Sequence, residues 1–265
     1  MNPWLHFVAL PVLGAALSCA SLTREEAQQA IEELQVASQA QALSSAAVEI
    51  GVDFSLGQGV ERAAEEIRDF IASQMPCAES SLAGSQLTVR YGVRPGACIH
   101  RGQTYQGAHT ITVSRGEGET IIVDHDWTNL ENERIRLSGG ATVTWSPTER
   151  TRHIVHDTQW LRLADGRTGE GRGDHIQSAL ASGLADGFAV EGEREWRGKS
   201  GQWNLTMAGV EMRWVDPVPQ AGEYALVAPE GDELRVNFSR TASTRIRVSI
   251  EGPRRSFDFD IDTRN

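Results

Sequence analysis

Two short stretches decide the fold of this 265-residue chain: HTITV at residues 109–113 and IIVDHDW at residues 121–127. In each of them apolar and polar side chains alternate, which is the pattern of a β-strand with one buried face. Between them lies Gly116-Glu117-Gly118, which suits a tight turn because glycine tolerates left-handed backbone angles. The two stretches therefore predict an antiparallel hairpin.

The turn also predicts a register for this hairpin. Centring the turn on Glu117 places His109 opposite His125, with Ile111 and Val123 on the same, apolar face. A slip of one residue would send Ile111 and Val123 to opposite faces, so odd slips are disfavoured. We therefore expect His109 and His125 to be cross-strand neighbours on the inner face of the sheet.

The same alternation recurs along the chain from Leu87 onward, and turn residues separate the runs at short intervals. This is the rhythm of successive hairpins, without the helices that parallel crossovers need. We predict a mainly β protein, a large antiparallel meander that forms an open sheet, a barrel or a sandwich, with an N-terminal helical segment. The expected domains are a signal peptide at 1–18, a helical spacer or hairpin at 19–76, the β-meander at 77–215 and further strands at 216–265 that could continue it.

Two helices are expected before the strands. Thr23-Arg24-Glu25-Glu26 is a capping box, and apolar residues then recur at helical spacing to about Ile50. A second helix should follow Gly59, with Ile67 and Ile71 on its apolar face, and Pro76 should stop it.

Composition limits the classes of function. The formal charge is −11, from 25 basic and 36 acidic residues, and Lys199 is the only lysine. A nucleic-acid-binding protein would need a basic surface, so we exclude that class. The sequence contains no GxSxG, HExxH or phosphate-binding glycine motif in a usable context. No catalytic residue or cofactor can therefore be assigned, and an enzymatic role is disfavoured.

The N-terminus indicates export. Residues 1–18 are apolar and too few to span a bilayer, and Ala16-Leu17-Ser18-Cys19 resembles the bacterial lipobox. The resemblance implies that Cys19 is acylated and anchors the chain, and Ala20 implies the outer membrane. The alternative is an ordinary signal peptide or a buried strand. With Cys19 set aside, Cys77 and Cys98 remain, and we predict that they form a disulfide, as in other exported proteins.

Histidines and tryptophans provide the candidate sites. If side chains alternate between the two faces without interruption along the paired strands, His109, His125 and His156 lie on one face, with His153 as a substitute for His156. Three converging imidazoles could bind zinc, as in a metal-dependent hydrolase or a metal-binding protein. The tryptophans expected on the same face, which could stack on a sugar ring or an apolar ligand such as a lipid, are Trp127, Trp145 and Trp160. The alternative is that both residue types only fill the core.

Three further segments have a structural interpretation beside a functional one. Residues 150–153 (RTRH) and 169–175 (GEGRGDH) could bind an anion, but we expect solvated loops. In the last strand, residues 257–262 (FDFDID), the aspartates share one face. They could bind calcium, but a charged edge strand that resists pairing with another sheet is the expected interpretation.

A set of strand and turn residues recurs between about Leu87 and Val215: Tyr91-Gly92, Cys98, Arg101-Gly102, Gly107, Val143-Thr144-Trp145, Arg152, His156, Gly192, Arg194 and Trp196. In these residues the layout resembles uncharacterised bacterial lipoproteins, of the type found in myxobacteria and Bacteroidetes, with repeated antiparallel β-hairpins. The resemblance implies the fold and a place in the cell envelope, and no mechanism. We therefore expect an outer-membrane lipoprotein, facing the periplasm or the cell surface, with a structural or ligand-binding role and a glycan, lipid or protein partner.

Overall fold

The computed structural model describes residues 24–51, 60–100, 103–183, 186–213, 216, 218–252 and 256–263. The predicted signal peptide, Cys19 and the capping residue Thr23 lie outside these ranges. Within the described ranges, no helix combines the length and the apolar character that crossing a membrane requires.

Both predicted helices are present. α1 is Arg24–Ile50 and α2 is Val60–Gln74. α2 buries one face, which includes Ile67 and Ile71 as the spacing predicts. It ends just before Pro76, whose ring and missing N–H group do not continue a helix.

The rest of the chain forms strands, which pair almost entirely in sequence order. The strands are β1 Glu79–Ala83, β2 Gln86–Tyr91, β3 Ile99–His100, β4 Gln103–Thr104, β5 Gln106–Arg115, β6 Ile121–Glu131, β7 Ile135–Ser146, β8 Thr151–Arg162, β9 Thr168–Ala179, β10 Gly187–Gly198, β11 Gly201–Arg213, β12 Ala221–Val227, β13 Glu233–Ala242, β14 Arg245–Glu251 and β15 Ser256–Asp262. Thirteen of them form one sheet in the order β1-β2-β5, then β6 to β15, and β3 pairs with β4 alone. The sheet is an open antiparallel meander, which confirms the predicted fold class, and β12–β15 continue it.

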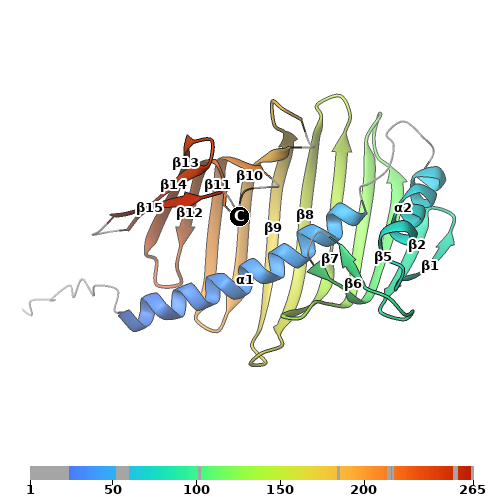
Figure 1. Ribbon diagram of the computed structural model, residues 1–265, viewed down its shortest axis with the longest axis horizontal. Helices are drawn as coiled ribbons and strands as arrows, with labels where there is room; N and C mark the ends of the chain where they lie inside the picture. Colours follow the sequence, from blue (N-terminus) through green and yellow to red (C-terminus); the bar gives the residue numbers. More distant parts are fainter. Residues whose placement is uncertain are drawn as a thin grey trace, which may run out of the picture.

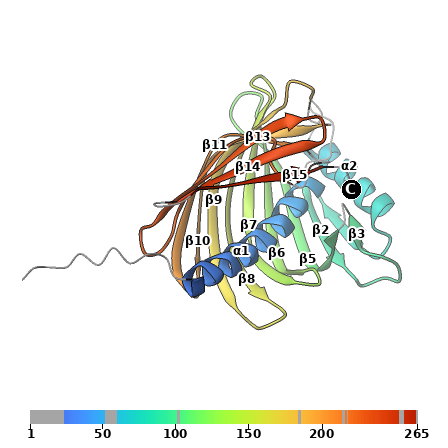
Figure 2. The same ribbon diagram turned by 60° about the vertical axis from the view of Figure 1, so that its left-hand side comes forward.

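The sheet is long and curled, and both helices lie on one of its faces. Figure 1 shows α1 crossing the strands, with α2 beside β2 and β5. Figure 2 shows the sheet curling around α1, with β13–β15 at one end of the curl. We call the face that carries the helices the inner face. The helices therefore do not form the predicted spacer or separate hairpin, because their apolar sides cover the apolar face of the sheet.

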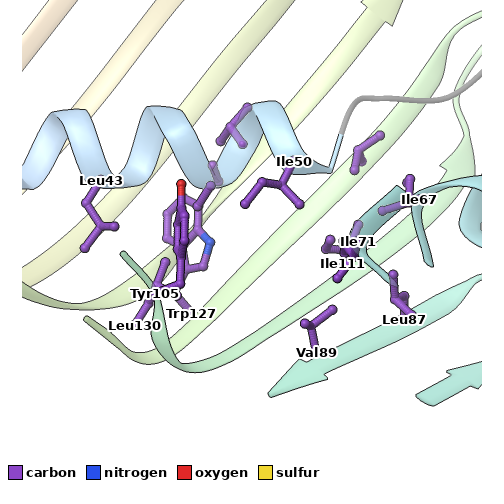
Figure 3. Close-up of a cluster of buried hydrophobic side chains, with 14 of the residues drawn as sticks. Leu43, Ile50, Ile67, Ile71, Leu87, Val89, Tyr105, Ile111, Trp127 and Leu130 are labelled. Carbon is purple, nitrogen blue, oxygen red and sulfur yellow. The ribbon is translucent and has the colours of Figure 1, made fainter. Parts of the chain in front are cut away.

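A continuous apolar core joins the helices to the first half of the sheet. Leu43 of α1 and Ile71 of α2 belong to the same cluster as Leu87, Ile111 and Leu130. Figure 3 shows these side chains converging between the helices and the strands. Fully burying one such side chain contributes about 1.5–3 kcal/mol, so this cluster dominates the stability of the fold.

The hairpin of β5 and β6 keeps the predicted faces but shifts the predicted register. His109 lies opposite Trp127 instead of His125, a shift of two residues. The cause is a wider turn, in which the Gly116 amide donates to the Thr120 carbonyl at 3.0 Å. Because the shift is even, each side chain stays on the face that the sequence predicts.

Two segments predicted as loops contribute to strands. Residues 150–153 lead into β8, and residues 169–175 lie within β9. The inner positions of β9 include Gly169, Gly171 and Gly173, which pair with inner-face residues of β8. The prediction of a loop at 169–175 is wrong because glycines at these positions hide the apolar alternation, and pairing on both sides overrides local propensity.

The predicted disulfide is present. Cys77 and Cys98 are bonded, with Cα atoms 5.3 Å apart and a sequence separation of 21. The bond links the segment after α2 to the segment before β3. Closing such a loop contributes on the order of 3 kcal/mol in the chain-entropy model.

The last strand is an edge strand, as predicted. β15 pairs only with β14, where Arg247 Nε donates to Asp260 Oδ1 at 3.2 Å. The opposite side of β15 carries Phe257 and Phe259, which are 53% and 50% exposed. In the described part of the chain, no group of three or more His, Cys, Asp or Glu residues is placed to hold a metal ion, and this includes the aspartates of β15.

Candidate functional site

His109 and His125 form a buried hydrogen-bonded row on the inner face. Tyr91 Oη lies 3.4 Å from Nδ1 of His109, and Nε2 of His109 lies 3.0 Å from Nδ1 of His125. The two imidazole centroids are 5.2 Å apart, and both rings pack against Trp127. Burial lowers the pKa of His125 to about 3, and burial and the neighbouring His125 lower the pKa of His109. Both imidazoles are therefore neutral at pH 7 and are part of the core.

The third predicted metal ligand, His156, does not join this row. It lies opposite Ala141, which itself lies opposite His125, so one strand separates the two histidines and they are about 10 Å apart across the sheet. Zinc ligands must approach one point to about 2 Å. The ring next to His156 is instead His175, with centroids 6.0 Å apart. The structure thus brings together two of the predicted ligands and gives the three-histidine metal site no geometric support.

His153, the substitute considered for His156, lies on the opposite face of the sheet. Its side chain is 46% exposed, and its Nε2 lies 2.5 Å from Oδ1 of Asp174. The odd spacing between His153 and His156 explains this, because alternate residues of a strand point to opposite faces.

Of the three predicted tryptophans, Trp160 borders open space. Trp127 is 1% exposed, and Trp145 packs against the Arg152 guanidinium, whose central carbon lies 5.5 Å from the indole centroid. Trp160 lies over Gly169 of β9, where a Cβ atom would come within 2.1 Å of the indole ring. Glycine at 169 is therefore needed for Trp160 to lie on the sheet, and this indole lines the cavity described next.

A cavity of about 270 Å³ lies between α1 and the inner face of strands β8–β13. Its space is created by small residues: Ala37 and Ala40 on α1, and Gly171 on β9. A Cβ atom at Gly171 would meet no heavy atom closer than 3.5 Å, so a small side chain would fit at this position in ordinary van der Waals contact. The apolar walls include Trp160, Trp196, Leu205, Leu226 and Val236, and the polar lining includes His156, Thr158, Arg194 and Tyr224.

Next to the cavity, polar residues join α1 to the sheet. Glu49 of α1 pairs with Arg152 of β8 at 2.6 Å, and the Arg152 side chain is only 4% exposed. Glu49 also lines a small gap beneath α1 together with His175 and Gln177 of β9. Burial, with the nearby charges of Arg194 and Arg152, lowers the pKa of His175 to about 3. The prediction of a solvated loop around Arg152 is therefore wrong, because this arginine holds α1 against the sheet.

The candidate-site predictions missed Arg194, Trp196 and Tyr224 as site residues. Trp196 stacks on Trp203, with centroids 5.9 Å apart and ring planes 2° from parallel. Arg194 lies opposite Gly173, and the His156 ring lies over this glycine, where a Cβ atom would come within 2.2 Å of the imidazole. The alternating glycines at 169–173 are the signal that could have found this site, because such glycines mark a strand over which neighbouring side chains lie.

The opposite face of the sheet carries a broader depression of about 850 Å³. Its polar side chains bind one another: Arg172 pairs with Asp157 at 3.0 Å, and Thr142 donates to Asp124 at 2.7 Å. Because these groups are exposed to water and already partnered, we place the candidate site in the inner-face cavity.

No family model matches the chain, and neither a curated protein nor a solved structure matches it. The candidate site therefore rests on the geometry of the inner face. That geometry is a cavity with two tryptophans in its walls and with Arg172, Arg194 and Glu195 among its charged lining residues.

Proposed function

We propose that this protein is an exported, lipid-anchored binding protein that holds a small, mostly apolar ligand between α1 and the inner face of the sheet. The observation that carries the proposal is the cavity of about 270 Å³. At about 30 Å³ per molecule, it has the space of roughly nine waters. Ligand pockets are typically apolar with a few placed polar groups, and the lining of this cavity has that character.

The cavity depends on residues that leave space where a core would normally be filled. Protein interiors are close-packed, and an unfilled apolar cavity costs stability in proportion to its volume. Here Gly171 has room for a side chain, and Ala37 and Ala40 face the same space from the helix. A bound apolar molecule would restore the missing contacts.

An aliphatic or aromatic ligand fits this lining better than a sugar. Leu205, Leu226 and Val236 offer no hydrogen-bond partners for the hydroxyl groups that surround a sugar ring. The indole rings of Trp160 and Trp196 can pack against either ligand. The aliphatic walls therefore favour a lipid-like molecule.

Saturable binding of a neutral apolar dye, N-phenyl-1-naphthylamine, tests the proposal. We expect its fluorescence to rise on addition of the protein and to saturate at one dye per chain. Gly171→Val should weaken this signal, because the new side chain takes up part of the cavity and a β-branched residue suits the strand. Ser178→Val is the matched control, since it places the same side chain on the same strand but on the opposite face.

Two results would overturn the cavity proposal. One is a wild-type chain that does not bind the dye. The other is a folded Gly171→Val variant that binds it as tightly as the wild type. Circular dichroism of both valine variants shows whether they fold.

The anchoring part of the proposal rests on two features. The sequence at Cys19 resembles a lipobox, and the disulfide between Cys77 and Cys98 is of a kind that persists outside the reducing cytoplasm. We expect an alkyne-labelled fatty acid to be incorporated into the wild-type chain in a bacterial host, and the chain to sediment with outer membranes. Cys19→Ala should lose both the label and the membrane association. A wild-type chain without label would contradict this part.

A further inference from the structure

The side chain of Arg194 is the feature of the cavity that a purely apolar ligand leaves unexplained. Arg194 lies on the inner face of β10, opposite Gly173 on one side and Leu205 on the other. Its Nε atom is buried and has no hydrogen-bond partner among the described residues. Within the same ranges it forms no ion pair.

Arg152 provides a comparison within the same face. Arg152 is paired with Glu49 at 2.6 Å, so its buried charge is balanced by a carboxylate. Arg194 has no such carboxylate in the described chain, although its strand is about as far from an edge of the sheet as the strand of Arg152. The Arg194 side chain is partly buried, and a guanidinium that loses hydration without gaining an anion is costly. The balancing charge is therefore expected from outside the chain.

The groups around Arg194 are consistent with a positive potential in this part of the inner face. Burial lowers the pKa of Arg194 to about 10, so the guanidinium remains charged at neutral pH. Burial, and then the charge of Arg194, lower the pKa of His156 to about 4. Tyr224, the other polar neighbour, is a phenol whose pKa burial raises, so it stays neutral. Neither His156 nor Tyr224 supplies a negative charge at neutral pH, and Glu195, which also lines the cavity, accepts a hydrogen bond from Gln202 at 3.0 Å.

We propose that the ligand is an anionic amphiphile, a medium-chain carboxylate or phosphate, whose acidic group binds the Arg194 guanidinium while its apolar part lies against Trp160, Trp196 and Leu226. This inference rests on the proposed function, because it names the class of ligand for the same cavity. A guanidinium binds a carboxylate or a phosphate through two parallel hydrogen bonds, which suits a planar donor on the wall of a narrow site. With the space of roughly nine waters, the cavity fits a chain of about ten carbon atoms better than a full phospholipid.

Displacement of N-phenyl-1-naphthylamine by four probes with the same ten-carbon chain tests the inference. The probes are decanoate, decyl phosphate, decanol and decyltrimethylammonium, all at pH 8. We expect decanoate or decyl phosphate to bind at least 10-fold more tightly than decanol, and the cationic probe to bind most weakly. The tighter of the two anions identifies the acidic group.

Arg194→Met removes the charge and keeps an extended apolar side chain. We expect it to weaken binding of the preferred anion by about 10- to 100-fold, as for the loss of hydrogen bonds to a charged group, and to leave decanol binding within about threefold. Arg197→Met is the matched control, because this arginine lies on the same strand but on the opposite face, where the side chain is 63% exposed. It should change neither affinity. Without ligand, Arg194→Met should unfold at the same temperature as the wild type or a higher one.

The outcomes separate this inference from the function on which it rests. If no probe and no dye binds, both fail. If decanol binds as tightly as the anions, or if Arg194→Met retains full affinity for them, the cavity remains a binding site and the assignment of an anionic ligand is wrong. A fall in the unfolding temperature of ligand-free Arg194→Met would mean that the guanidinium is satisfied within the chain, which also contradicts it. The probe series on the wild type decides the question even if the variant does not fold.

Discussion

The two halves of the inner face follow the same sequence pattern but are packed differently. Over β1–β8, one continuous cluster joins both helices to the strands, and side chains such as Ile111 and Leu137 are fully buried. Over β9–β15, the described apolar residues form three small clusters, and Phe259 at the far edge is half exposed. Alternation of apolar residues therefore predicts which face is inner, but it does not predict how well that face is filled.

The difference begins at β9. On β8 the inner positions carry His156, Thr158 and Trp160, whereas the positions opposite them on β9 are all glycine. Trp160 and His156 lie over Gly169 and Gly173, and Gly171 between them lines the cavity between α1 and the second half of the sheet. The first half thus supplies the stability that allows the second half to contain unfilled space.

The largest expected effect concerns the ion pair that attaches α1 to the first half. Glu49→Gln leaves the Arg152 guanidinium, 4% exposed, without its carboxylate. Leaving one partner of a buried pair uncompensated costs about 3–5 kcal/mol, so the urea midpoint should fall sharply. The double variant Glu49→Leu/Arg152→Met should recover much of this loss. If Glu49→Gln unfolds at the wild-type urea concentration, the pair does not hold the helix.

A matched pair of substitutions measures the difference in packing directly. Ile111→Ala, in the continuous cluster and 0% exposed, should cost about 2–5 kcal/mol. Ile250→Ala, on the inner face of β14 and only partly buried, should cost about 1 kcal/mol because less apolar surface returns to water. Urea unfolding of both variants provides the measurement. Equal losses would show that the second half is packed as tightly as the first.

The sequence predicts the parts of the fold that depend on local pattern. The alternation at 109–113 and 121–127 identifies the inner face correctly. The register differs from the predicted one by two residues, but a shift by an even number leaves each side chain on the same face. The helical spacing of apolar residues that ends at Ile50 predicts α1, and the pair of cysteines predicts the disulfide. These signals lie in residues that are close in sequence or in the number of cysteines.

The candidate site depends on contacts that no local pattern contains. Gly171 and Arg194 face one cavity only because β9 pairs with β10 and α1 crosses both, and nothing in either segment encodes that crossing. Glycine at alternate positions looks like a loop until the neighbouring strands are known. For His156 the sequence predicts the correct face but the wrong neighbours. His125 and His156 share the inner face, but strand β7 lies between them, so they cannot bind one metal ion.

The last prediction tests how tightly the inner face is packed at β9, where the two halves meet. His175 lies on β9, is 2% exposed and has a pKa lowered to about 3, mainly by burial. Its pKa in the unfolded chain is about 6.5, so its contribution to stability is complete above pH 6.5 and is lost as the pH falls toward 3. Between pH 7 and pH 5 this group should cost about 2 kcal/mol, at about 1.4 kcal/mol per pH unit below 6.5.

Urea unfolding at pH 7 and at pH 5 isolates this contribution. The loss of stability over that interval should be about 2 kcal/mol smaller in His175→Gln than in the wild type. His153→Gln is the matched control, because it removes an imidazole that is 46% exposed on the opposite face of the neighbouring strand; the effect of His175→Gln should exceed the effect of this control. If His175→Gln also leaves it unchanged, water reaches His175 through the gap beneath α1, and the loose packing of the second half extends along the whole of β9.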